Sequence, residues 1–412
     1  MSRFTLPCTN GVNHLPKPSG PFSVGFVDIF TPPRNGSLPG LLFRLYYPSS
    51  TPIAQVDENQ TRWGRWFPLP QYANGYLRYK FSSLGLMVPV LGRLFTWLSG
   101  NPLVPAAEGA RILKDGNRWP VVVFSHGLAA CRTSYSFLCT DLASKGYFVA
   151  ALEHGDGSAC LRTLKTSKDA QIEFKYQELL EAGTPEYEIR NKQVKQRASE
   201  AGDALNMLEQ MNQGSFNNTW VQNMTETELD DFQRDVKDSM NTDMVVIGGH
   251  SFGGATTTLC LATDPRFKVG VALDSWMFPI REENLNYTSP GNLLFINCEK
   301  FQGTKNLQTM KTYEGSLDNE VKSNVVTVLK ATHYAPTDIP IIMEGSKANS
   351  LYKMIGGGGE AADGLSNWDN VQLFSGLFHS WVQKCLGFEN SFAKMVAEQE
   401  ANLTYGIEIK QE

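Results

Sequence analysis

The chain has 412 residues, of which 42% are hydrophobic and 19% charged, a composition that supports a packed core and excludes wholesale disorder. The formal net charge of −5 argues against the strongly basic surface of a nucleic-acid-binding protein. The 7 cysteines show neither C-x-x-C nor zinc-site spacing, and several lie inside apolar runs, so we expect free buried thiols and a reducing compartment.

The N-terminal part predicts two adjacent strands. The runs "FSVGFVDIF" and "LLFRLYYPS" lie close together and are separated by a turn rich in Pro, Gly and Asn, a pattern typical of an antiparallel pair. The stretch before them, "MSRFTLPCTNGVNHLP", contains neither the apolar core of a signal peptide nor an N-myristoylation glycine. We therefore expect a cytoplasmic protein, peripheral on membranes, while several N-x-S/T sequons keep secretion as an alternative.

Residues 75–98 contain the most apolar candidate for a surface segment. The run "LGLMVPVLGRLFTWL" is interrupted by Pro89 and Arg93, and it falls short of the roughly 20 residues that a membrane-spanning helix needs. Two interpretations stay open. The segment is either a buried helix or an amphipathic helix at a lipid surface, with Leu94, Phe95 and Trp97 as the lipid contacts.

Beyond residue 120, short and nearly continuous apolar runs recur, as expected for strands buried on both faces of a parallel sheet. They are "VVVFSHG" (121–127), "YFVAALEH" (147–154), "MVVIGGHS" (244–251), "VGVALDS" (269–275), "LLFINCE" (293–299) and "NVVTVLKATH" (324–333). Helix-compatible segments separate several of them, at 133–145, 191–211 and 253–262. This alternation predicts an α/β fold with right-handed crossovers and with the N-terminal antiparallel pair at one edge.

We expect one domain over residues 1–412. The charged, partly helical stretch 161–243 is interpreted as an insertion between two core strands, because the rhythm of strands resumes after it. The glycine run in "MIGGGGEAADG" lacks the strand-to-helix setting of a phosphate-binding loop, and we expect no cofactor there.

The stretch "VVIGGHSFGGAT" contains the pattern G-x-S-x-G around Ser251. A strand-like run precedes it and a helix-compatible run of small and apolar residues follows it. In this setting the pattern is typical of a nucleophile elbow, in which a strained turn exposes the serine and glycines allow strand and helix to approach closely. We therefore predict that Ser251 is the nucleophile of a serine hydrolase with an α/β-hydrolase fold.

An activated serine needs a base, and the base needs an acid that orients it. Among the histidines only His333 follows a late strand, which agrees with the α/β-hydrolase order of serine, acid, histidine. For the acid, spacing leaves Asp274 and Glu299 equally suited, because each ends one of the two strands after the elbow.

The oxyanion of ester hydrolysis requires preorganised N–H donors. In this fold one donor is the residue after the nucleophile, here Phe252, and the other belongs to the loop after an early strand. The run "VVVFSHGLAACRTSY" supplies such a loop, and we predict Leu128 as the second donor. After Asp274 the residues Trp276 and Phe278 are candidates both for core packing and for a substrate pocket.

Several stretches together resemble the platelet-activating factor acetylhydrolases, which are calcium-independent group VII phospholipases A2. They are "GPFSVGFVDIF" with "LFRLYYPS", "WPVVVFSHGLAACRTSYSFLCTDLASKGYFVAALEH", "IRNKQVKQRASEA", "GGHSFGGAT" and "RFKVGVALDSWMFP". The resemblance covers most of residues 20–335, and the residues beyond about 345 match the family poorly.

The resemblance implies an α/β-hydrolase fold without a metal, and a triad of Ser251, Asp274 and His333, which selects Asp274 over Glu299. It implies hydrolysis of phospholipids with a short or oxidised sn-2 acyl chain, such as platelet-activating factor. It also implies that residues 75–98 contact a membrane or lipoprotein surface. Two alternatives remain, a general serine carboxylesterase for small soluble esters and a non-catalytic hydrolase-fold binding protein, and the oligomeric state is not predicted.

Overall fold

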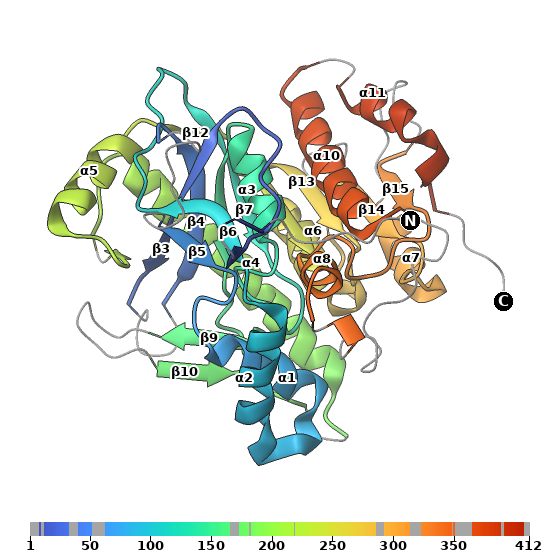
Figure 1. Ribbon diagram of the computed structural model, residues 1–412. Coiled ribbons are helices and arrows are strands. Elements are labelled where there is room, and N and C mark those ends of the chain that lie inside the picture. The colour runs from blue at the N-terminus through green and yellow to red at the C-terminus, as the bar shows by residue number, and fades with distance from the viewer. Residues whose placement is uncertain are drawn as a thin grey trace.

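The computed structural model describes residues 8–9, 12–32, 40–51, 62–164, 173–180, 183–217, 219–285, 292–313, 323–347, 349–350, 365–388 and 391–407. A twisted sheet with helices on both faces organises these residues (Figure 1). Its middle part consists of parallel strands in the spatial order β15-β14-β13-β12-β7-β8. They are β7 Trp119–Ser125, β8 Phe148–Leu152, β12 Met240–His250, β13 Phe267–Leu273, β14 Leu293–Cys298 and β15 Val325–Val328. The predicted α/β fold is confirmed.

The predicted antiparallel pair extends one edge of this sheet. Strand β4 Leu42–Ser49 pairs antiparallel with both β8 and β3 Ser23–Phe30. Beyond β3 come β6 Leu103–Glu108 and β5 Trp63–Arg65, while β11 Trp220–Val221 also pairs with β3. At the opposite edge β16 Leu403–Tyr405 pairs with β15, and β1 Cys8–Thr9 pairs with β2 Val12–Asn13 apart from the sheet.

Alternating side chains divide the apolar interior into two cores. In β7, Val122 and Phe124 face one core while Val121 and Val123 face the other, as the pleat of a strand requires. The first core is covered by α3 Ser136–Ser144 and α10 Asn367–Cys385, with α8 Ile339–Glu344 and α11 Ser391–Glu398 beside them. The second is covered by α4 Glu186–Asn212, α5 Glu226–Val236 and α6 Phe252–Thr263.

The stretch 161–243 connects β8 to β12. It begins with the hairpin of β9 Leu161–Leu164 and β10 Glu173–Tyr176 and continues into α4. Helix α4 buries an apolar stripe that includes Val194, Ala201, Leu205 and Leu208, and it packs against α6. Several charged residues of this core helix are exposed, whereas Arg190, Arg197 and Glu200 are buried.

Helices α1 Gln71–Lys80 and α2 Val88–Ser99, joined by the 3-10 turn η2 Ser82–Met87, lie side by side at one end of the molecule (Figure 1). The inner face of α2 buries Val88, Gly92, Phe95 and Ser99. Leu94 and Trp97 are exposed, but Phe95 is only 9% exposed. The expectation that Phe95 shares the outer face with Leu94 and Trp97 is wrong, since the helical spacing turns the Phe95 side chain to the inner face. Among the described residues, none of the helices is apolar over a length sufficient to cross a membrane.

Candidate active site

Ser251 lies at the sharp turn between β12 and α6, with φ 56° and ψ −114°. This left-handed φ is strained for a residue with a side chain. The turn also brings backbones into close contact: a Cβ on Gly249 would lie 2.3 Å from the Gly253 carbonyl oxygen, and one on Gly253 would lie 2.0 Å from the Ser125 carbonyl oxygen. Both positions thus require glycine, which gives the G-x-S-x-G pattern its physical reason.

His333 lies between Ser251 and Asp274 and forms a hydrogen bond with each. Its Nε2 is 2.9 Å from the Ser251 Oγ, and its Nδ1 is 2.6 Å from the Asp274 Oδ2. Asp274 is fully buried, whereas the His333 side chain is 23% exposed. The carboxylate can only accept from Nδ1–H, so Nε2 is left as the acceptor for the serine proton.

The Asp274 carboxylate is held by further donors. Its Oδ1 accepts from the Cys298 N–H at 2.8 Å and from the Gln302 Nε2 at 2.6 Å. Glu299 is exposed, and its carboxylate instead accepts from the Lys330 N–H at 2.6 Å. Of the two acids that spacing left open, Asp274 is therefore the one beside His333.

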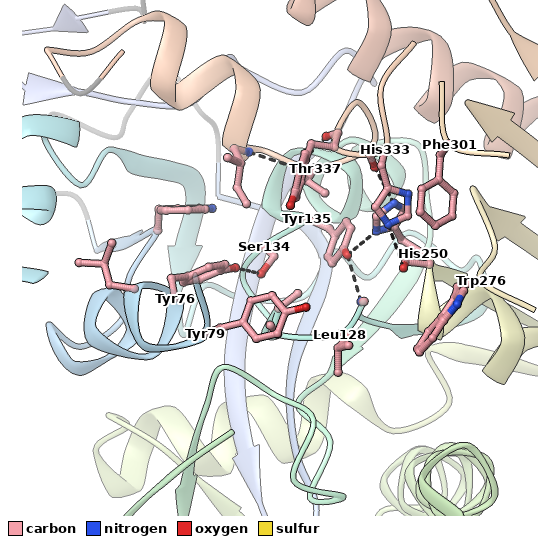
Figure 2. A pocket seen from close by; sticks show the side chains of 18 of the residues that line it. Tyr76, Tyr79, Leu128, Ser134, Tyr135, His250, Trp276, Phe301, His333 and Thr337 are labelled. Atoms are coloured by element: carbon pink, nitrogen blue, oxygen red, sulfur yellow. Dashed lines mark hydrogen bonds between the residues drawn. The ribbon is translucent and has the colours of Figure 1, made fainter. Parts of the chain in front are cut away.

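The ring of Phe301 stacks on His333, with centroids 3.7 Å apart and planes at 19° (Figure 2). Sequence reasoning missed both Phe301 and Gln302. The only signal for them is that they follow β14, a strand that ends at the same edge of the sheet as the elbow.

The two predicted oxyanion donors belong to two different segments near the nucleophile. Phe252 is the first residue of α6, and Leu128 follows β7 and lines the same cavity as Ser251. Arg197 on α4 contacts both segments. It donates from Nη1 to the His126 carbonyl at 2.6 Å, and its guanidinium lies 4.2 Å from the centroid of the Phe252 ring. Because Arg197 is itself fully buried and paired with Asp156 at 2.9 Å, it fixes the relative position of these two segments.

A buried relay links the loop before Leu128 to the loop that carries the base (Figure 2). The Gly127 N–H donates to the Tyr135 Oη at 3.0 Å, and this hydroxyl is 2.8 Å from the His250 Nδ1. The His250 Nε2 is 2.8 Å from the His333 carbonyl oxygen. A carbonyl only accepts, so Nε2 carries the proton and Nδ1 accepts from Tyr135.

Burial, and next the nearby His333, hold the pKa of His250 well below its ordinary range. Burial likewise raises the pKa of the Tyr135 hydroxyl far above its ordinary range. At neutral pH both groups are therefore uncharged. This agrees with the assigned hydrogen bonds, in which the Tyr135 hydroxyl donates to the His250 Nδ1 and the His250 Nε2–H donates to the His333 carbonyl oxygen. Sequence reasoning placed His250 next to the nucleophile but missed its link to Tyr135.

Ser251 opens onto a cavity of about 740 Å³ whose wall is mostly aromatic and aliphatic. The wall is formed by Trp66, Tyr76, Leu77, Tyr79, Phe95, Gly127, Leu128, Ala129, Ala130, Ser134, Tyr135, Glu186, Arg190, His250, Ser251, Trp276, Phe301, His333, Tyr334, Thr337 and Ile339. Figure 2 shows Trp276 on one side of Leu128 and Tyr76 and Tyr79 on the other. Of the two predicted pocket residues, Trp276 lines the cavity, and Phe278 stacks on Trp276 at 5.4 Å rather than lining it.

His250, Asp274 and His333 are close enough to be considered as metal ligands, since one ligand atom from each lies within 4.8 Å of the others. The nitrogen atoms of both histidines already take part in hydrogen bonds to protein atoms. This grouping is therefore better described as part of the hydrogen-bond network around Ser251 than as a metal centre.

Comparison with known proteins points to one family. The sequence model described as "Platelet-activating factor acetylhydrolase, isoform II" matches residues 8–395. The family match thus extends past residue 345, into the region where the motifs of the sequence resemble the family poorly. This region includes α10, which buries Phe374, Phe378 and Trp381 against the core, and an apolar helix face of this kind is less distinctive by eye than the motifs around the site.

Two curated proteins named platelet-activating factor acetylhydrolase match most of the chain. The one from Canis lupus familiaris is 36% identical over 78% of this chain and 67% of its own length. The one from Gallus gallus is 33% identical over 83% of this chain and 78% of its own length. Among solved structures, a ferulic acid esterase from Streptomyces cinnamoneus superimposes with a TM-score of 0.59 at 18% identity, covering 89% of this chain and 91% of that one. This last likeness concerns the fold alone.

Proposed function

The chain belongs to the platelet-activating factor acetylhydrolase family, and from this premise we propose that it hydrolyses the sn-2 ester of phospholipids with short or oxidised acyl chains. The reaction passes through an acyl-enzyme on Ser251. The observation that carries the proposal is the hydrogen-bonded series Asp274, His333, Ser251 at the wall of an apolar cavity.

Acylation begins when the Ser251 Oγ attacks the ester carbonyl while His333 Nε2 removes the hydroxyl proton. Asp274 holds the Nδ1–H tautomer and stabilises the imidazolium that forms. The carbonyl oxygen becomes an oxyanion, which the backbone N–H groups of Leu128 and Phe252 stabilise together with the N-terminus of α6. His333 then delivers its proton to the leaving sn-2 oxygen, and the lysophospholipid departs.

Deacylation repeats the sequence with water. As the water attacks the acyl carbonyl, His333 takes a proton from this water. His333 returns the proton to the Ser251 Oγ when the short carboxylic acid leaves. Each charge that develops has a partner supplied by the chain, so the proposed reaction does not require Ca²⁺.

The proposal predicts a preference for short sn-2 chains. A panel of phosphatidylcholines with sn-2 chains from acetyl to palmitoyl tests it, with kcat/KM measured for each. We expect the highest values for acetyl and for oxidised, truncated chains. A preference for palmitoyl would contradict the proposal, and failure of a fluorophosphonate probe to label Ser251 would favour a non-catalytic binding protein.

We also propose that the outer face of α2 contacts a membrane or lipoprotein surface. Met87, Val90, Leu94 and Trp97 are spaced on one helical face, and they are between 43% and 69% exposed. The opposite face of the same helix brings Phe95 to the cavity wall. An exposed apolar surface on a helix whose other face lines the cavity is suited to receiving substrate from a lipid layer.

A double substitution tests this surface. Leu94→Ser with Trp97→Ser should lower activity on phospholipid vesicles by about 10-fold or more, because apolar burial at about 25 cal/mol per Å² is lost, while p-nitrophenyl butyrate hydrolysis stays unchanged. Equal activity of variant and wild type on vesicles would remove the surface contact and favour the alternative of a general carboxylesterase for small soluble esters.

A further inference from the structure

Arg190 on α4 lies in the wall of the cavity that contains Ser251. Its side chain is only 6% exposed. Among the described residues of the wall, Arg190 is the one Lys or Arg, and Glu186, one turn earlier on α4, is the one carboxylate. A buried cation in an otherwise apolar wall needs an explanation, because a charge is costly to bury without an anionic partner.

Other buried arginines of this protein have such partners. Arg44 donates from Nε and Nη2 to both carboxylate oxygens of Asp28, each at 2.8 Å. Arg197 donates to Asp156 at 2.9 Å, and both side chains are fully buried. These pairs have the short, charge-assisted geometry that compensates for the loss of water.

Arg190 has a much weaker partner. Its Nε is 3.4 Å from a carboxylate oxygen of Glu186, whose side chain is 52% exposed. Its Nη1 donates to the Gln193 Oε1 at 2.9 Å, a neutral acceptor that is itself fixed by the Asp156 carbonyl at 2.9 Å. The guanidinium is thus held in place by a polar contact, while its charge is only partly compensated.

The Nη2 of Arg190 has no hydrogen-bond acceptor among the described residues, and it is not among the buried atoms that lack one. The Nη2 atom therefore keeps exposed surface, and Arg190 lines both the Ser251 cavity and a smaller pocket that shares Tyr79 and Glu186 with it. A planar guanidinium with an accessible edge is well suited to an oxyanion such as phosphate, which it can bind with two parallel N–H donors.

We propose that Arg190 binds the phosphodiester group of the phospholipid headgroup and so orients the substrate whose ester Ser251 attacks. This inference rests on the proposed function, because it assigns one part of the same substrate. Glu186 lies beside Arg190 on the half-exposed side, where its carboxylate can face the cationic end of a zwitterionic headgroup. The partially exposed ring of Tyr79 shares that wall and offers its face to a quaternary ammonium.

The test compares three esters that give the same butyryl-enzyme. They are monomeric dibutyrylphosphatidylcholine, dibutyrylglycerol, which lacks the phosphate, and p-nitrophenyl butyrate. Because deacylation is common to all three, differences in kcat/KM report on the departing part of the ester. Arg190→Gln should lower kcat/KM for the phosphatidylcholine by about 10- to 100-fold, the range for losing a charge-assisted hydrogen bond, and change the other two less than 3-fold.

Two further variants sharpen the result. Lys195→Gln removes a positive charge from the same helix, where Lys195 pairs with Glu283 at 2.7 Å on the surface, and it should leave all three esters unchanged. Arg190→Lys keeps the charge but loses the planar pair of donors, so it should retain an intermediate activity on the phosphatidylcholine. It also serves as the test if Arg190→Gln does not fold.

The outcomes distinguish the phosphate subsite from the proposed function. If Arg190→Gln or Arg190→Lys lowers kcat/KM equally for all three esters, or leaves kcat/KM for the phosphatidylcholine unchanged, the phosphate subsite is overturned and the proposed function stands. If the wild-type protein hydrolyses p-nitrophenyl butyrate but no phosphatidylcholine, the proposed function itself fails. A non-hydrolysable diether glycerophosphocholine gives an independent reading, since its inhibition constant against p-nitrophenyl butyrate should rise about 10-fold or more in Arg190→Gln.

Discussion

Two serine–histidine–carboxylate series occur among the residues that the structure describes. In the first, His333 connects Ser251 and Asp274 through hydrogen bonds of 2.9 and 2.6 Å. In the second, His154 connects Ser125 and Glu200 through hydrogen bonds of 2.8 and 2.7 Å. The interatomic distances alone do not distinguish them, so hydrogen-bond geometry is not what marks the first as the candidate active site.

What differs is the surroundings of the serine. Ser125 is fully buried at the end of β7 and does not line the described cavity, whereas Ser251 does. Ser251 also has a left-handed φ and precedes the N-terminus of α6. A nucleophile needs space for a substrate and donors for an oxyanion as much as it needs a base, and only Ser251 has both.

The second series, Ser125–His154–Glu200, is called the sealed series because its serine does not line the cavity. It has a structural role next to the site. The His154 N–H donates to the His126 Nε2 at 3.2 Å, and the His126 Nδ1 is 2.7 Å from the Gly127 carbonyl oxygen. It therefore supports the segment that leads into Leu128. We expect changes in the first series to abolish turnover and changes in the second to affect mainly stability.

Replacing the two serines is the strongest test of this contrast. Ser251→Ala should lower kcat on the order of 10⁴-fold or more, as for other triad nucleophiles, and abolish fluorophosphonate labelling. Ser125→Ala should keep kcat within about 3-fold and cost about 1–3 kcal/mol of unfolding free energy, because the His154 Nε2 loses its donor. Ester hydrolysis and urea unfolding measure both, and loss of labelling in Ser125→Ala would contradict the distinction.

The two carboxylates provide the next comparison. Asp274→Asn should lower kcat by about 10³-fold or more, because the amide no longer holds the Nδ1–H tautomer and cannot stabilise the imidazolium. Glu200→Gln can still accept the His154 Nδ1–H through its Oε1, so kcat should stay within about 3-fold of wild type. The measurement is kcat for p-nitrophenyl butyrate, and similar losses in both variants would show that the series are functionally coupled.

Much of the fold and the core of the site could be predicted from local signals. The strands are recognisable in the sequence as apolar runs, and Ser251 is flanked by glycines that the tight turn requires. His333 is marked by its place after a late strand. The choice between Asp274 and Glu299 was not available from spacing, because it depends on which side chain turns inward at the end of neighbouring strands.

Other features depend on contacts between distant segments. The relay through Tyr135 and His250 joins residues 115 positions apart, and the support of Asp274 by Gln302 comes from the loop after another strand. Phe95 shows a further limit. Helix α2 is apolar on both faces, so its sequence pattern could not indicate which face turns toward the cavity.

Removing the relay hydroxyl should have a moderate effect that falls between those of the two series. Tyr135→Phe leaves the Gly127 N–H and the His250 Nδ1 without their shared partner, so the oxyanion loop and the His333 loop lose their fixed relation. We expect kcat to fall about 10-fold, the equivalent of one lost hydrogen bond, with KM within 2-fold. Affinity for a trifluoromethyl ketone, which mimics the oxyanion, should fall by a similar factor.

The matched control for the relay is Tyr46→Phe. Tyr46 is also fully buried, and its hydroxyl donates to the Ser136 Oγ at 3.3 Å without lining the cavity. The Tyr46→Phe variant should have a lower unfolding free energy, but its kcat and its affinity for the trifluoromethyl ketone should be unchanged. If both tyrosine variants lose only stability, the relay has no influence on the reaction.

The smallest expected effect concerns pH and the sealed series. Burial holds the pKa of His154 well below its ordinary range and raises the pKa of Glu200. Below pH 6.5 the unfolded chain therefore binds a proton at His154 that the folded chain does not, and stability falls on acidification. Glu200 acts in the opposite sense, since above pH 4.5 the folded chain retains its proton more than the unfolded chain does.

Removing Glu200 takes away the opposing contribution. Between pH 6.5 and pH 4.5 the unfolding free energy of Glu200→Gln should therefore fall more steeply with acidification than that of wild type, by up to about 1.4 kcal/mol per pH unit. Urea unfolding at several pH values measures the slope. A shallower slope in the variant would mean that Glu200 is ionised and His154 protonated in the folded protein, so that the two form an ion pair.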